Sequence, residues 1–130
     1  MATLDDVSRL AARLPETTEA QRRGTRAWAV AGKVFAWERP FSKADIKRYG
    51  TEPVPAGPIV ATAVGDLAEK EAVLAAGTPG VFTIPHFDGY AAVLIELDEI
   101  AEPALDAALV DAWLAKAPSR LSASYVAGEP

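Results

Sequence analysis

The sequence predicts an α+β domain in which helices pack mainly on one face of an antiparallel sheet. Segments with helix and strand patterns follow the order helix, three strands, short helix, strand, helix, two strands, helix. Runs of strands separated by helices are typical of α+β folds. Residues 93–97 are nearly all apolar, as expected of a central strand covered on both faces. The 130 residues, 50% of them hydrophobic, suffice for one domain with its own core.

The first helix is predicted to begin after Thr3. Thr3 is a favourable N-cap residue, and Asp6 follows three residues later in the position of a capping box. Pro15 ends the helix because proline cannot continue its hydrogen bonding. Residues 16–21 are polar and indicate a short edge strand.

Residues 26–30 and 33–38 are predicted to form a hairpin, with Ala31-Gly32 as its two-residue turn. A regular register places three cross-strand pairs on one face: Val30 with Lys33, Trp28 with Phe35, and Arg26 with Trp37. The opposite face is mainly alanine, so we expect helices to pack closely against it. The aromatic face has two interpretations. It is either core, since aromatic residues dominate burial, or a partly open surface for stacking bases or an apolar ligand.

The rest of the chain is predicted to contain three helices and three strands. A short basic helix over residues 43–49 begins at Ser42. Strands are expected at 59–64, 81–84 and 91–97, and helices at 66–77 and 103–118. The last helix carries an apolar stripe that includes Trp113, so we expect this residue to be structural. Residues 1–121 form the expected domain, followed by a small, polar and flexible tail over residues 122–130.

Composition excludes several classes of protein. There are no cysteines, which removes disulfides, thiolate metal sites and cysteine nucleophiles. No apolar run approaches the ~20 residues of a transmembrane helix. The first residues lack the basic and apolar regions of a signal peptide. We therefore expect a cytoplasmic protein that does not bind to membranes.

Charge is distributed unevenly along the chain. The net charge is −5, but residues 1–50 contain ten basic and six acidic residues, whereas residues 51–130 contain three and twelve. The densest basic region, residues 22–48, predicts a DNA-binding surface made of Arg22, Arg23, Arg26, Lys33, Arg39, Lys43, Lys47 and Arg48. The alternative is that these charges are solvated or neutralised when the two halves of the chain fold together.

No catalytic constellation is visible. His86 and Asp88 could be imagined as a base and its orienting group. The chain lacks a nucleophile elbow, a glycine-rich phosphate loop, an HExxH motif and a second histidine. We expect no enzymatic activity, no metal site and no cofactor. A second interpretation is a module that binds a protein or small ligand through the aromatic face and the loop of residues 85–90, with Trp28, Phe35, Trp37, His86 and Tyr90.

Several segments, in this order and spacing, resemble the MmcQ/YjbR-like family. They are Leu14-Pro15, the hairpin of residues 30–36, the strand and helix around residues 66–77, residues 85–90 before an apolar strand, and Asp111-Ala112-Trp113 with Ala117-Pro118. The resemblance covers residues 4–121. It implies a CyaY-like fold and DNA binding, and it supplies no catalytic residues. The DNA-binding label of this family is a fold-level inference. The acidic second half departs from a basic nucleic-acid binder.

Overall fold

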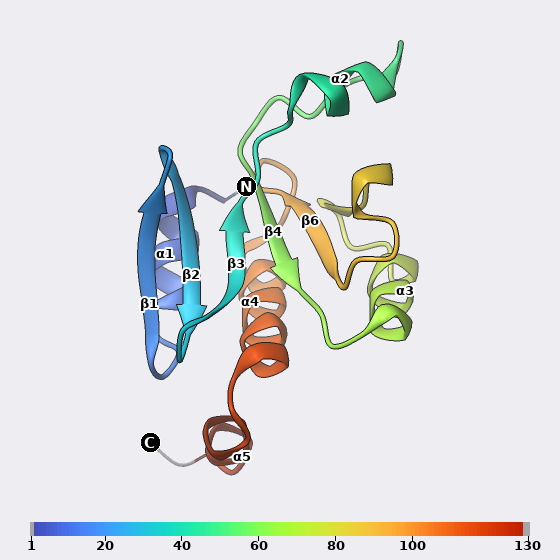
Figure 1. Cartoon of the computed structure of the whole chain (residues 1–130). Coiled ribbons are helices and arrows are strands. Elements are labelled where there is room, and N and C mark those ends of the chain that lie inside the picture. Colours follow the sequence, from blue (N-terminus) through green and yellow to red (C-terminus); the bar gives the residue numbers. More distant parts are fainter. Residues whose placement is uncertain (1, 129–130) are drawn as a thin grey trace.

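The architecture is a six-stranded antiparallel sheet with five α-helices, which confirms the α+β class (Figure 1). A computed structural model describes residues 2–128, the side chain of Arg22 excepted. The strand order is β1-β2-β3-β4-β6-β5, so β1 and β5 are the edges. The helices are α1 (Leu4–Ala11), α2 (Lys43–Tyr49), α3 (Leu67–Ala75), α4 (Glu102–Lys116) and α5 (Ser119–Val126), with a 3-10 turn η1 (Pro85–Phe87). The strands are β1 (Thr17–Arg22), β2 (Thr25–Val30), β3 (Lys33–Glu38), β4 (Ile59–Ala63), β5 (Val81–Phe82) and β6 (Ala92–Glu96).

Helices α1 and α4 cover one face of the sheet, behind β1–β2 and β3–β4 respectively (Figure 1). The expected capping box of α1 is present, with Thr3 and Asp6 exchanging side-chain and backbone hydrogen bonds. We call the layer beneath these helices the helix-side core. It contains Trp113 of α4, which is fully buried and donates its indole N–H to the Pro15 carbonyl at 3.0 Å. The expectation that Trp113 is a structural residue is confirmed.

The end of the chain forms a helix where the sequence indicated a polar tail. Helix α5 runs from Ser119 to Val126 and buries Leu121, and the Tyr125 ring lies 5.1 Å from the Trp113 ring. The apolar residues spaced along this segment give it a face that packs on α4. The last two positions of the expected tail, residues 129–130, lie outside the described residues.

The β2–β3 hairpin has the predicted turn but not the predicted register. Ala31 and Gly32 both have positive φ, 49° and 84°, as a tight primed turn requires. Val30 pairs with Lys33 as expected, but a bulge opposite Trp28 and Ala29 shifts the pairing by one residue. Trp28 therefore pairs with Ala36, and Trp37 pairs with Ala27 instead of Arg26.

Helices cover the predicted aromatic face of the hairpin, and the bulge moves Trp37 to the opposite face. Trp28 and Phe35 are 1% and 0% exposed and belong to the helix-side core. Ala27 and Ala29, which we expected beneath helices, are only half-buried on the opposite face. The interpretation as core is thus confirmed for Trp28 and Phe35, and the interpretation of an open aromatic face is wrong for them. A single extra residue in one strand is enough to turn the following side chains to the other face.

A second apolar cluster covers the other face of β4 and β6. Successive residues of a strand point to opposite faces, so Val60 enters the helix-side core while Ile59 and Ala61 enter this opposite-face core. Its further members are Ile84, Phe87, Ala92 and Leu94, with Trp37, Phe41, Tyr49 and Phe82 packed around them. This cluster holds the segment around η1 and the residues that flank α2 against the sheet.

Candidate functional site

The fold gathers most of the predicted DNA-binding residues at one end of the sheet. The β1–β2 turn, the end of β3 and α2 all lie at the top in Figure 1. The Arg26 backbone N–H donates to the Glu38 carboxylate at 3.0 Å, which joins the start of β2 to the end of β3. We call this region the basic end. It carries Arg23, Arg26, Arg39, Lys43, Lys47 and Arg48, and the backbone of Arg22; the Arg22 side chain lies outside the described residues.

Lys33 does not belong to this group. It begins β3 beside the β2–β3 turn, at the opposite end of the hairpin. Its exposed side chain therefore lies about one strand length away from the basic end.

Three arginines of the basic end are engaged by carboxylates. The Arg26 guanidinium donates to Asp5 at 2.9 Å and to the Ser8 hydroxyl at 3.2 Å, which ties β2 to α1. Arg39 and Arg48 both pair with Asp45, at 3.0 and 3.4 Å. Part of the positive charge that the sequence assigned to DNA contacts is thus neutralised within the fold.

Asp45 organises the base of α2. Its side chain is 1% exposed, and besides the two arginines it accepts the Ser42 backbone N–H at 2.9 Å. The Ser42 hydroxyl in turn accepts the Asp45 N–H at 3.1 Å, completing the predicted capping box. Burial alone would raise the pKa of Asp45, but the hydrogen bonds from Ser42 and Arg39 outweigh it and hold the pKa below 3.8. Asp45 is therefore ionised at neutral pH.

Besides Arg48, which is paired with Asp45, the exposed cations of the basic end are Lys43, Lys47 and Arg23. Within residues 2–128, none of the three has a described carboxylate at ion-pair distance. Lys43 and Lys47 stand four residues apart on α2, so they lie on the same face of that helix. These three groups can bind an anion without competition from a described carboxylate.

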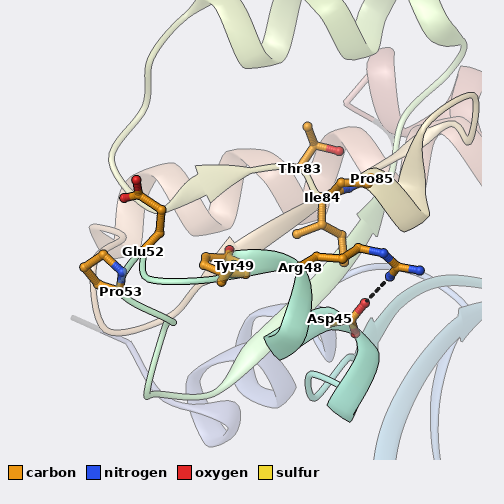
Figure 2. Close-up of a pocket in the computed structure, with 8 residues that line it drawn as sticks. All are labelled: Asp45, Arg48, Tyr49, Glu52, Pro53, Thr83, Ile84 and Pro85. Atoms are coloured by element: carbon orange, nitrogen blue, oxygen red, sulfur yellow. Dashed lines mark hydrogen bonds and ion pairs between the residues drawn. The ribbon is translucent and has the colours of Figure 1, made fainter.

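A pocket of about 380 Å³ lies beside α2 (Figure 2). Arg48 stands at one end and Glu52 at the other, with Tyr49 between them. The far wall consists of Thr83, Ile84 and Pro85, just before and at the start of η1. The pocket thus has a cation, an anion, a flat aromatic ring and an apolar wall within one cavity.

The Tyr49 ring packs within a group of neighbouring aromatic rings. Its centroid lies 5.5 Å from that of Phe41, which packs in turn on Phe82 of β5. Burial, followed by the negative charges of Glu96 and Asp45, raises the pKa of the Tyr49 hydroxyl. The phenol is therefore neutral, and the ring is held in place at the pocket.

Acidic groups flank the basic end on the β6 side. The pKa of Glu96 is raised, first by burial and then by the charges of Glu99 and Asp98. Tyr49 and Glu96 line a common surface hollow, which brings this flank next to α2. A polyanion bound at α2 would be repelled on this side, which limits the size of its footprint.

The residues of the predicted ligand-binding surface are separated by the fold. Trp28 and Phe35 are buried beneath α1 and α4, whereas Trp37 is half-buried on the opposite face beside exposed Tyr90, with ring centroids 6.2 Å apart. His86 is exposed in η1. What remains of that surface is the cluster of Trp37, Phe87 and Tyr90.

Lys70 is an important residue that our sequence reasoning missed. It is 7% exposed, and its ammonium donates to the carbonyls of Phe87 and Tyr90 at 2.5 and 2.8 Å. Helix α3 is thereby attached to the loop that follows η1. The signal in the sequence was a lysine placed between Leu67 and Leu74 on one side of the predicted helix.

The described residues show no centre for metal chemistry. Residues 2–128 contain no group of three or more histidine or acidic side chains that could hold a metal ion. Of the helices in the same range, none has both the length and the apolar character needed to cross a membrane.

The fold and the basic end define a small α+β protein with a one-sided layer of helices. The chain belongs to the same family as the proteins Rv2570 and MT2646 of Mycobacterium tuberculosis and Mb2600 of Mycobacterium bovis. Each is 45% identical to it over 131 residues, which cover 98% of this chain and 98% of the relative, and each is described as an uncharacterised protein. No family model matches the chain, and no solved structure matches it.

Proposed function

We propose that this protein is a non-catalytic module that binds DNA weakly, through contacts between its basic end and the phosphate backbone. The observation that carries the proposal is the pair of exposed lysines, Lys43 and Lys47, on one face of α2, with Arg23 at the same end of the sheet. Phosphate contacts by lysine and arginine supply essentially all of non-specific DNA binding. The resemblance to the MmcQ/YjbR-like family agrees with this function.

The expected affinity follows from the number of available cations. Three phosphate contacts give a slope of log K against log salt of about −2.7, because each contact to duplex DNA contributes about −0.9. Raising the salt fourfold then weakens binding by roughly 40-fold. The acidic flank at Glu96, Asp98 and Glu99 prevents a larger footprint, so the dissociation constant belongs to the non-specific range of ~10⁻⁴–10⁻⁶ M.

Sequence-specific reading of DNA is not part of the proposal. Helix α2 has seven residues, and the side chains it exposes are mainly lysine and arginine instead of asparagine or glutamine. Direct readout needs side chains that reach base edges from an element seated in a groove. Such a short helix can rest on the backbone, so we expect little preference among sequences.

The test is a titration with fluorescent duplex DNA at two salt concentrations. The double variant Lys43→Glu, Lys47→Glu should lose most binding at low salt and lower the slope by about 2. The matched control Lys33→Glu, Lys116→Glu makes the same change of charge away from the basic end and should bind like the wild type. Salt-insensitive binding, equal losses in both double variants, or no binding at low salt would overturn the proposal.

A further inference from the structure

The pocket beside α2 has a shape and chemistry that simple phosphate contacts do not use. At about 380 Å³ it lies within the range of small-ligand sites, ~300–1,000 Å³. Its lining residue Arg48 follows Lys47 in α2 and lies about 100° around the helix from the lysine face, so Arg48 is the cation that a nucleotide in the pocket would contact. We propose that this pocket accepts one unstacked nucleobase, and that the protein therefore prefers single-stranded to duplex DNA. This inference rests on the proposed function.

The walls of the pocket suit a flat ring. Tyr49 forms one wall, and Ile84 and Pro85 form the other (Figure 2). The Tyr49 ring also packs against Phe41. Proteins that bind single strands stack bases on aromatic side chains, and this works for every base because each has a π-face. The packing on Phe41 matters because a ring that is already held in place loses little freedom on binding.

The two ends of the pocket match the two ends of a nucleotide. Arg48 lies at the end nearest Asp45, where its side chain is 46% exposed and can reach a phosphate while it stays paired. Glu52 lies at the other end, exposed. A carboxylate there accepts hydrogen bonds from the N–H groups on the Watson–Crick edge of a base.

Duplex DNA cannot use this pocket without breaking a base pair. Extruding a base costs unstacking and unpairing energy, which is least for a base that is already single-stranded. The lysines of α2 contact the phosphates of both forms of DNA, and their salt-dependent contribution is smaller for a single strand than for a duplex. The preference for single strands should therefore come from the pocket alone and disappear with it.

The experiment compares a fluorescent oligothymidylate, which forms no duplex, with a duplex of equal length at one low salt concentration. Wild type should bind the single strand more tightly than the duplex, and at least fivefold more tightly than a variant without the Tyr49 ring does, the low end of the effect of one stacked base. Tyr49→Ala should remove this preference and leave duplex binding unchanged. Tyr49→Leu, which keeps an apolar side chain against Phe41 but lacks the flat ring, should do the same even if the alanine variant is unstable.

Two further variants separate the contributions. Glu52→Gln should keep binding to both forms but change the discrimination between oligothymidylate and an oligocytidylate, because the amide both donates and accepts. Tyr90→Ala, a matched loss of an exposed tyrosine at another site, should have no effect. Equal binding of both forms by the wild type, or folded Tyr49 variants that retain the preference, would refute the base-binding pocket. The proposed function fails separately, if the Lys43→Glu, Lys47→Glu variant still binds duplex.

Discussion

Replacing Lys70 by methionine tests whether the buried ammonium holds the loop after η1 in place. Methionine keeps most of the apolar stem of the lysine but removes the donor of both hydrogen bonds to the Phe87 and Tyr90 carbonyls. Both carbonyls keep a hydrogen-bond donor in the variant. The Phe87 carbonyl also accepts the Tyr90 N–H at 3.0 Å, and the Tyr90 carbonyl accepts the Ala92 N–H at 2.9 Å. The loss of unfolding free energy should therefore lie at the low end of the range for hydrogen bonds from a charged group.

The magnitude follows from the number of bonds. Two hydrogen bonds from a charged donor, at about 1.5 kcal/mol each, give a loss of about 3 kcal/mol. An unfolding entropy of about 2.1 cal/mol/K per residue corresponds to about 0.27 kcal/mol/K for 130 residues. The melting temperature of Lys70→Met should therefore fall by about 10 °C.

Thermal unfolding followed by circular dichroism measures this change, with Lys116→Met as the control. Lys116 is exposed at the end of α4, so the same substitution there should leave the melting temperature nearly unchanged. Hydrogen exchange adds a local reading, since the amides of Tyr90 and Ala92 should exchange faster in Lys70→Met. If both variants melt with the wild type, the two hydrogen bonds contribute nothing net and the reasoning is wrong.

Three further predictions concern stability. Trp113→Ala should cost about 4 kcal/mol, seen as a fall in melting temperature of about 15 °C, because the residue is fully buried. Asp45→Ala should cost about 3 kcal/mol at pH 7. Because the folded pKa of Asp45 is depressed, its contribution is present above pH 3.8 and lost as the pH falls further, so urea unfolding should show the wild type and this variant converging at lower pH. Gly80→Ala should destabilise more than Gly24→Ala in the same measurement. Both glycines have positive φ, but only at Gly80 would a Cβ lie 2.9 Å from the Glu96 carbonyl oxygen.

The sequence predicted the elements well because their signals are local. Thr3 and Ser42 begin their helices as expected, with the side chains three residues later completing both capping boxes. Ala31-Gly32 forms the turn that its length indicated. Each of these features depends on a few neighbouring residues, and their chemistry can be read without knowledge of the fold.

The placement of side chains on faces was less predictable, because one bulge changes it. Nothing in residues 33–38 distinguishes a regular strand from a bulged one, and the helices packed on the hairpin decide which register buries most apolar surface. Trp37 was therefore expected on the same face as Trp28 and Phe35 but lies on the opposite one. Helix α5 was missed for a related reason. Leu121 and Tyr125 have a buried surface to pack on only because Trp113 lies beside them in the fold.

The candidate site contains some features that have a local sequence signal and others that only the fold determines. The sequence identified the lysines of α2, but it could not show that Asp45, expected only as a capping residue, also binds Arg39 and Arg48. The pocket joins α2 to residues 83–85, which are more than thirty positions away in the chain. Long-range proximity of this kind is set by the packing of Phe41, Tyr49 and Phe82 and has no local signal.

The open edges of the sheet bear on how this protein behaves at high concentration. An unpaired strand edge is a template on which another molecule can add a strand and start a fibre. At one edge, β1 reads Thr17-Thr18-Glu19-Ala20-Gln21-Arg22, a polar and charged stretch with low β-aggregation tendency. At the other edge, β5 has two residues, too few to template a ladder. The architecture therefore resists edge-to-edge assembly without needing a closed barrel or a covering partner.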